Sequence, residues 1–270
     1  MNKIQSRIIL SIICLSGLFG QNYYGSGAFA NIGSSVNSLA RGNTMFSDKY
    51  TSSSMFHNPA NLHWIDDGLS FNMLNRNNNK YFGDYSVFSM AKPIDGSLLT
   101  WGLALIYLKV GDIDQYDDQA NYISTFSSNE ICASFGLSGF MNRQAWGGKL
   151  NLIYHSYPGL SNDIPLTVGV DIGYIYSLDW KPTTGYDLKI FPLLGVTLNR
   201  YFHFKDPLEN KNYLPSTVRF GLQLAEWNYD IIPDQLGLNI QSYMDLVQQS
   251  DYPFKLAFGT AIGLAYPDWI

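Results

Sequence analysis

Hydrophobic and polar residues alternate along positions 166–178 of the chain. The even positions are apolar or aromatic, whereas the odd positions are mostly small or polar and include Asp171. Side chains of a β-strand point alternately to its two faces, so the pattern predicts a strand with one apolar and one polar face. The stretch is about twice as long as a strand in most soluble domains. Taken alone, it fits either a transmembrane sheet or the core of a soluble β-sandwich.

From Gly68 onward the same alternation recurs and predicts ten antiparallel strands. Charged residues inside the predicted strands fall on the face opposite the apolar one. A charge on a lipid-facing position near the bilayer midplane costs about 2–4 kcal/mol, so this segregation favours an all-β fold, a transmembrane antiparallel β-barrel with the charges in its lumen. The charges are Lys149, Asp171, Lys189, Arg219, Asp245 and Lys255. The strands are expected at about 68–75, 81–91, 98–110, 130–141, 146–156, 166–178, 188–200, 216–226, 235–246 and 254–266.

Inside the lumen we expect these charges to neutralise one another, with Asp171 paired to Lys149 or Lys189. Lys109 is the exception on the apolar face, at a strand end from which a long side chain reaches the interface. The two longest expected connections, 111–129 and 201–215, fall at the same end of the strands. Outer-membrane barrels place long loops at their outer end.

The connection at 111–129 contains four aspartates, which could bind calcium because hard cations take several carboxylates. It lacks the glycine and the terminal glutamate of an EF-hand loop. A solvated loop is therefore preferred, and no metal site is predicted there.

The composition agrees with a membrane location. Charged residues make up 14% of the chain, where soluble domains have about 25%, and 19 Tyr, 16 Phe and 6 Trp suit the aromatic girdles of a barrel. Residues 1–20 predict a secretory signal, in which Lys3 and Arg7 precede an apolar stretch. The remaining chain is acidic, which argues against nucleic acid as a partner. Cys132 is then its only cysteine, so no intrachain disulfide is expected.

Residues 21–66 show neither a helical nor a strand period, and Asn58 before Pro59 marks a turn. We expect an irregular N-terminal segment over 21–66, followed by the β-barrel over residues 67–270.

No motif of an enzyme occurs in the chain. The histidines lack metal-ligand spacing, and there is no nucleophile elbow or phosphate loop, so no cofactor and no metal are expected. His57 and His63 are expected to be satisfied polar residues. A hydrolase would need His155 beside Ser134 or Ser138, and packing of small residues in the lumen is the preferred explanation for those serines.

The stretch S-L-A-R-G-N-T-M-F-S-D is followed by H-N-P-A-N-L before the first predicted strand. Further motifs follow at 101–114, 126–130, 170–176, 194–198 and 214–222. Their order and spacing resemble the PorV/PorQ family, a branch of the FadL-like outer-membrane barrels. The chain departs from the family pattern at Phe46, Ser47 and residues 51–54, where the family has Gly-Ala and an acidic-Ala run. The residues that carry the first motif are Ala40, Arg41, Asn58, Pro59, Ala60 and Leu62.

The resemblance implies a barrel of about fourteen strands with the N-terminal segment in the lumen as a plug. It also implies a non-enzymatic outer-membrane component of type IX secretion that docks or tethers secreted cargo. Since alternation predicts only ten strands, either weakly patterned regions hide further strands or the chain is a shortened copy.

Two other functions stay open: a FadL-like transporter of hydrophobic small molecules and a soluble extracellular β-sandwich. A plug closed by Arg41 and polar lumen residues would favour docking, whereas a continuous apolar lining would favour transport.

Overall fold

The computed structural model of the protein describes residues 34–65, 68–78, 83–156, 166–177, 193–203, 217–232, 236–249 and 254–265. Over these residues the chain is all-β, as predicted, with ten strands in one antiparallel sheet whose order follows the sequence. The expected signal sequence at 1–20 lies outside the described residues. The strands are β1 (Ser70–Asn78), β2 (Gly83–Pro93), β3 (Leu99–Tyr116), β4 (Tyr122–Met141), β5 (Gln144–Ser156), β6 (Leu166–Ser177), β7 (Leu193–His203), β8 (Thr217–Ile232), β9 (Leu236–Gln249) and β10 (Lys255–Ala265).

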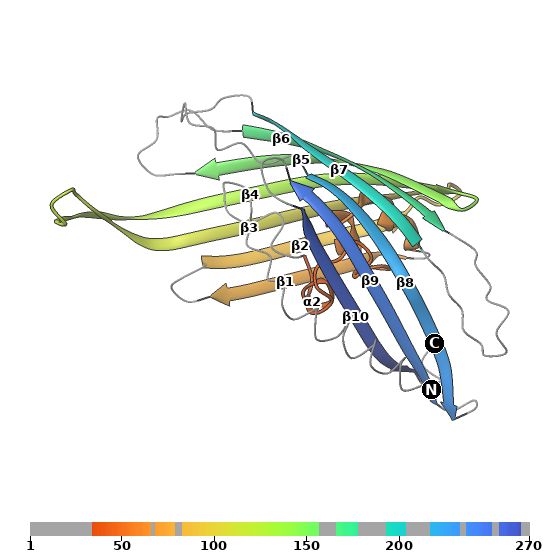
Figure 1. The fold of residues 1–270 in the computed structure, drawn as a ribbon. Coiled ribbons are helices and arrows are strands. Elements are labelled where there is room, and N and C mark those ends of the chain that lie inside the picture. Colours follow the sequence, from red (N-terminus) through yellow and green to blue (C-terminus); the bar gives the residue numbers. More distant parts are fainter. Residues whose placement is uncertain are drawn as a thin grey trace.

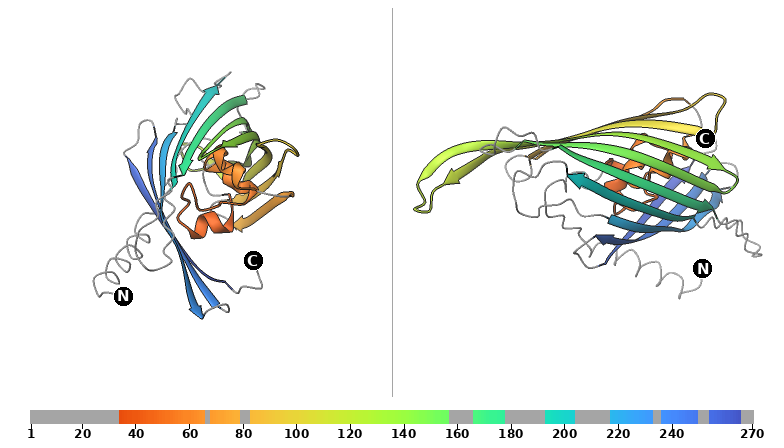
Figure 2. Two further views of the ribbon diagram at one scale, coloured as in Figure 1. Left: turned by 90° about the vertical axis from the view of Figure 1, so that its right-hand side faces the viewer. Right: turned by 90° about the horizontal axis from the view of Figure 1, so that it is seen from above.

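The sheet curves strongly, and its concave side holds the part of the chain that precedes β1 (Figures 1 and 2). That part contains the helix α2 (Val36–Ala40) and the 3-10 helices η2 (Ser52–Phe56) and η3 (Pro59–Trp64). Within the described residues β1 pairs only with β2 and β10 only with β9, so the sheet is open along one side. No helix in this part of the chain is long and apolar enough to cross a membrane.

The two faces of the sheet are distributed as the alternation predicts. On β6 the inward Asp171 and Ile175 are almost completely buried, whereas the outward Ile172 is 59% exposed and Tyr174 41% exposed. A soluble protein buries its apolar sheet face, but here the apolar face is the exposed one. The described part also has no second sheet to cover that face, so the soluble β-sandwich does not fit the fold.

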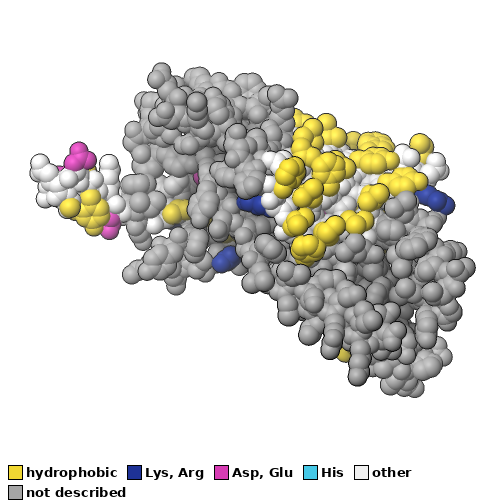
Figure 3. All heavy atoms as spheres, in the orientation of Figure 1, with side chains coloured by type: hydrophobic (Ala, Val, Ile, Leu, Met, Phe, Trp, Pro, Cys, Tyr) yellow, Lys and Arg dark blue, Asp and Glu magenta, His cyan; other side chains and the backbone are white. Residues whose placement is uncertain are grey.

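Exposed apolar side chains form a broad outer surface (Figure 3). Monomeric soluble proteins rarely expose a contiguous apolar patch larger than a few hundred Å². A surface of this composition therefore requires an apolar environment. Members on the described strands include Phe71, Met73, Phe88, Leu103, Leu105, Phe135, Trp146, Leu150, Leu152, Val170, Ile172, Tyr174, Leu194, Val196, Leu198, Phe220, Leu256, Ile262 and Leu264.

The prediction of a connecting loop at 111–129 is wrong. Strands β3 and β4 continue through most of these residues as a projecting hairpin (Figure 1). The polar residues that suggested a loop make cross-strand contacts instead. Thr125 Oγ1 donates to Asp114 Oδ1 over 2.6 Å, and the rings of Tyr116 and Tyr122 meet edge to face at 6.1 Å. Only residues 117–121 form the turn. None of the described residues forms a group of three or more His, Cys, Asp or Glu able to hold a metal.

At the hairpin turn, Asp117 Oδ1 accepts the backbone N–H groups of Gln119 and Asn121 over 2.9 and 2.8 Å. Hydrogen bonds from the Asn121 side chain and backbone lower the pKa of the Asp117 carboxyl. The turn is thus fixed by local hydrogen bonds to a charged side chain.

The expectation that the two longest connections share one end loses one of its two members, because 111–129 is reduced to the turn at 117–121. The other expected long connection, 201–215, and residues 178–192 between β6 and β7 lie mostly or wholly outside the described residues. Strand β7 begins at Leu193, and the expected strand residues 188–192 lie outside the described residues together with Lys189. Connection lengths therefore do not assign the outer end of the sheet.

Candidate functional site

Residues 34–65, which precede β1, form a compact segment that we call the inner segment. Ser35 caps α2 by accepting the N–H of Ser38 over 3.0 Å, and Asn58 caps η3 by accepting the N–H of Ala60 over 2.9 Å. Pro59 follows that cap at the first helical position, where its missing N–H is not needed. Side-chain caps thus begin two of the three short helices in a stretch without periodicity, and η2 has no such cap.

A row of inward-facing glycines receives the inner segment. Gly147 on β5 is directly opposite Gly173 on β6, and Gly195 on β7 is directly opposite Gly221 on β8. A Cβ at Gly147 would lie 2.5 Å from the backbone of Pro59, and one at Gly173 would overlap Asn58 Oδ1. The backbone of the sheet and the inner segment thus approach to a distance that only glycine permits. We call this row, with the opposed pair Gly102 and Gly136, the glycine track: Gly102, Gly136, Gly147, Gly173, Gly195 and Gly221.

Asn58 connects the inner segment to two neighbouring strands. While its Oδ1 caps η3, its Nδ2 lies 3.4 Å from the carbonyl oxygens of Tyr174 on β6 and Val196 on β7. One buried side chain therefore fixes both the local turn and its position on the sheet.

The other motif residues are divided between contact with the sheet and contact within the segment. Pro59, Ala60 and Leu62 are buried against the glycine track. Ala40 is exposed at the end of α2. Arg41 donates from Nη1 to the carbonyl of Ser47 over 3.0 Å, so its guanidinium holds the segment's own fold.

Two buried ion pairs lie on the inner face. Lys149 Nζ is 2.7 Å from Asp171 Oδ2, which confirms the predicted pairing, and Arg219 Nη1 is 3.7 Å from Asp245 Oδ2. Asp245 Oδ2 also accepts the backbone N–H of Met45 over 2.6 Å. The charges of the two pairs therefore neutralise one another, and Asp245 also binds the inner segment through Met45. Lys255 is half-buried on β10 on the same face.

His57 joins the inner segment to Arg219. Its Nε2 lies 2.8 Å from Ser38 Oγ, whose own hydrogen is donated to Asn43 Oδ1 over 2.6 Å. Nε2 must then donate to Ser38, which leaves Nδ1 as the acceptor for Arg219 Nη1 at 3.4 Å. Burial, and then the charges of Arg219 and Lys149, hold the pKa of His57 well below its usual range, so the ring is neutral at pH 7.

This lowered pKa makes stability depend on pH. Below about pH 6.5 the unfolded chain binds a proton at His57 that the folded chain does not bind, so the unfolding free energy falls as the pH falls. Between about pH 7.5 and 5.5 we expect the wild-type protein to lose about 1.4 kcal/mol more than the variant His57→Gln. Urea unfolding at both pH values measures this, and carboxylates common to both proteins cancel. Equal losses in the two proteins would contradict the assignment of a neutral His57.

Ser38 and His57 are not arranged as a catalytic nucleophile and its general base. The hydroxyl hydrogen of Ser38 is donated to Asn43, and the far nitrogen of His57 faces a cation where a catalytic triad has a carboxylate. Ser134 donates to Asn151 over 2.7 Å, as expected for packing on the inner face. His155 lies on β5.

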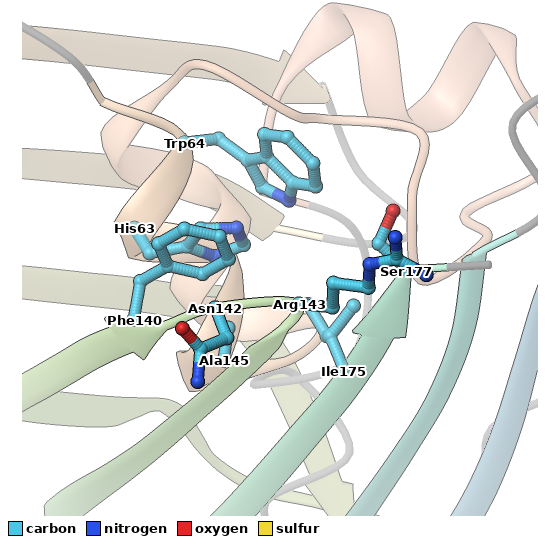
Figure 4. Close-up of a pocket in the computed structure, with 8 residues that line it drawn as sticks. All are labelled: His63, Trp64, Phe140, Asn142, Arg143, Ala145, Ile175 and Ser177. Atoms are coloured by element: carbon cyan, nitrogen blue, oxygen red, sulfur yellow. The ribbon is translucent and has the colours of Figure 1, made fainter. Parts of the chain in front are cut away.

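A pocket lies where η3 meets the ends of β4, β5 and β6 (Figure 4). Its volume is about 370 Å³. The ring of His63 stacks on Phe140 with centroids 5.0 Å apart, and His63 Nδ1 donates to the carbonyl of Ala60 over 2.6 Å. The residues lining it are His63, Trp64, Phe140, Asn142, Arg143, Ala145, Ile175 and Ser177.

No protein-family model and no curated protein matches this chain. Among solved structures, the β domain of the Bordetella autotransporter BrkA is similar at 10% sequence identity, with a TM-score of 0.36. The match covers 71% of this chain and 77% of that domain.

Sequence reasoning did not find the glycine track, the role of His57 or the pocket. The inward glycines were visible as small residues on the polar face, but their opposition depends on the register between strands. Glycines at inward positions of successive predicted strands are a pattern in the sequence that would have indicated the glycine track.

Proposed function

We propose that the protein is a non-enzymatic outer-membrane β-barrel whose interior is closed by the inner segment acting as a plug. In this proposal the exposed apolar surface contacts membrane lipid, and the protein docks or tethers secreted proteins in the manner of the PorV/PorQ family. The supporting observation is the reversal of the two sheet faces: apolar side chains are exposed outside, and Lys149, Asp171, Arg219 and Asp245 are buried inside. A membrane makes that distribution favourable.

The polar character of the closed interior favours docking over transport. The inner segment reaches from β1, where Ser52 N donates to Ser70 Oγ over 2.9 Å, to β10, where the carbonyl of Arg41 lies against Gly259. Along this path it meets the two buried ion pairs and not a continuous apolar lining. Arg41 itself does not close the interior, since its guanidinium bonds within the segment. A hydrophobic molecule would have to break these polar contacts to pass.

The projecting β3–β4 hairpin suits a docking role. Tyr116, Tyr122 and Ile123 are more than half exposed near its tip, and exposed aromatic side chains are common anchors of protein interfaces. The residues between Lys109 and Arg143 include no Lys, Arg or His.

Co-purification from outer membranes tests this proposal. The tagged full chain is expected to retain secretion components or cargo in stoichiometric amounts. A variant in which residues 113–126 are replaced by a two-residue Asn-Gly turn is expected to reach the membrane and lose them. The matched control is Asp95→Asn, a charge removed from an exposed turn away from the hairpin. Recovery of stoichiometric fatty acid without any protein would contradict docking and support the FadL-like transporter.

A further inference from the structure

The inner segment crosses the open side of the sheet, from one edge strand to the other. At one end, Asn72 Nδ2 on β1 donates to the carbonyl of Ser34 over 3.0 Å. At the other end, the backbone of Gly42 lies against that of Phe258 on β10, so closely that a Cβ at Gly42 would overlap the Phe258 carbonyl. Helix α2 is the stretch between these two contacts, and it lies between β1 and β10 in Figure 1.

The ten described strands leave no room for direct pairing of β1 with β10 around the inner segment. The diameter of a barrel grows with its number of strands, and side chains alone fill the interior of a barrel of about eight strands. Ten strands closed on themselves would enclose only slightly more space. A helix with its side chains is about 10 Å across, and the inner segment contains α2, η2 and η3. The inner segment therefore holds the two edge strands apart.

Helix α2 exposes its apolar side and buries its polar side, as the sheet does. Val36 is 68% exposed and Leu39 41% exposed. Both lie on the same side of the helix as the exposed Ala40, because the three residues occupy positions i, i+3 and i+4. On the other side, Ser35 and Ser38 are buried and form hydrogen bonds within the inner segment. A helix in water buries its apolar side, so this orientation requires an apolar environment around α2.

We propose that α2 completes the wall of the barrel between β1 and β10, and that Val36, Leu39 and Ala40 contact the acyl chains of membrane lipid. The outward side chains beside its two contacts, Phe71 on β1 and Leu256 on β10, are also exposed. Helix α2 thus continues the apolar outer surface from one edge strand to the other. The inference rests on the proposed membrane barrel and adds that a helix of the plug, in place of a pair of strands, forms part of its lipid-facing wall.

Spin labels at Val36 and Leu39 test this contact in the full chain with Cys132→Ser, placed in lipid vesicles. Collision rates are measured with oxygen, which enters the bilayer, and with an aqueous nickel complex. We expect the ratio of the two rates at both sites to lie within about threefold of the ratio at Ile172 on β6, because all three labels are then in one apolar band. If Ile172 collides mainly with oxygen while Val36 and Leu39 collide mainly with nickel or with neither reagent, this inference is overturned and the barrel stands. If Ile172 itself collides mainly with nickel, the membrane barrel fails and the inference fails with it.

Disulfide formation distinguishes a gap filled by α2 from direct pairing of the edge strands. In the Cys132→Ser background, Met73→Cys on β1 is combined in turn with a cysteine at each of four outward positions of β10, namely Leu256, Phe258, Thr260 and Ile262. Facing residues of paired strands lie about 4.5–5.5 Å apart, within reach of a disulfide, whereas a helix about 10 Å across keeps them out of reach.

Under copper–phenanthroline oxidation we expect none of these four pairs to form a disulfide. The matched control is Met73→Cys with Phe88→Cys, two residues directly opposite each other on β1 and β2, which should form one readily. A disulfide in any of the four pairs, within one chain or between two copies, would show that the edge strands pair directly and would overturn the proposal.

Discussion

The variant Lys149→Met is expected to lose about 3–5 kcal/mol of unfolding free energy, because it leaves the carboxylate of Asp171 buried without its partner. Both side chains of this pair are at least nine-tenths buried, and Lys149 Nζ also lies 5.3 Å from the ring centroid of Phe56 in the inner segment. The loss should therefore include weaker binding of that segment. Urea unfolding in lipid vesicles, followed by tryptophan fluorescence, measures it.

Two companion variants identify the cause of that loss. Lys149→Met combined with Asp171→Leu should recover most of the stability, because an apolar pair needs no compensation for a buried charge. Asp95→Asn breaks the exposed pair with Lys92 and should cost no more than about 1 kcal/mol. If Lys149→Met costs no more than Asp95→Asn, the two inner-face charges are not buried as a pair.

The variant Gly173→Val should release the inner segment from the sheet. A side chain at Gly173 overlaps Asn58, and the neighbouring Pro59 cannot retreat because it lies against the backbone of Gly147. Overpacking of this kind costs about 1–3 kcal/mol, and here it also breaks the cap of η3. Trypsin is expected to cut after Arg41 and Lys49 in folded protein several times faster than in the wild type.

Gly148→Val is the matched control for that variant. Gly148 follows Gly147 on β5 but faces outward, and no atom lies within 4 Å of the position its Cβ would take. The same glycine-to-valine change there should leave the cleavage rate at Arg41 and Lys49 unchanged. Equal cleavage in both variants would show that the inner segment does not depend on the glycine track.

The faces of the strands could be predicted from the sequence because a strand places successive side chains on opposite sides wherever no β-bulge interrupts it. Asp171 and Lys149 both fall on the polar face of neighbouring strands, so Lys149 was one of the two partners predicted for Asp171, and the structure shows that pair. In the register of β5 and β6, Lys149 lies directly opposite Asp171. Ile172 and Tyr174 are exposed for the same reason.

The ends of strands and the contacts of the inner segment could not be predicted in the same way. Asp114 is of a residue type that is depleted in strands, but the backbone pairing of β3 with β4 continues past it, and Thr125 donates to its side chain across the hairpin. His57 is separated from Arg219 by most of the chain, so no local pattern signals their contact. The motif residues Asn58 and Pro59 were found through resemblance, whereas their place against Gly147 and Gly173 depends on the folded sheet.

The central claim is that the outer face of the sheet contacts lipid while the inner face is covered by protein. Spin labels on single cysteines, in a Cys132→Ser background, test it by their collision rates with oxygen, which enters the bilayer, and with an aqueous nickel complex. Labels at Ile172 and Tyr174 should collide mainly with oxygen, labels at Thr167 and Ile175 with neither reagent, and a label at Gln119 in the hairpin turn mainly with nickel. If Ile172 and Tyr174 collide mainly with nickel, their face is in water and the account of a membrane barrel is wrong.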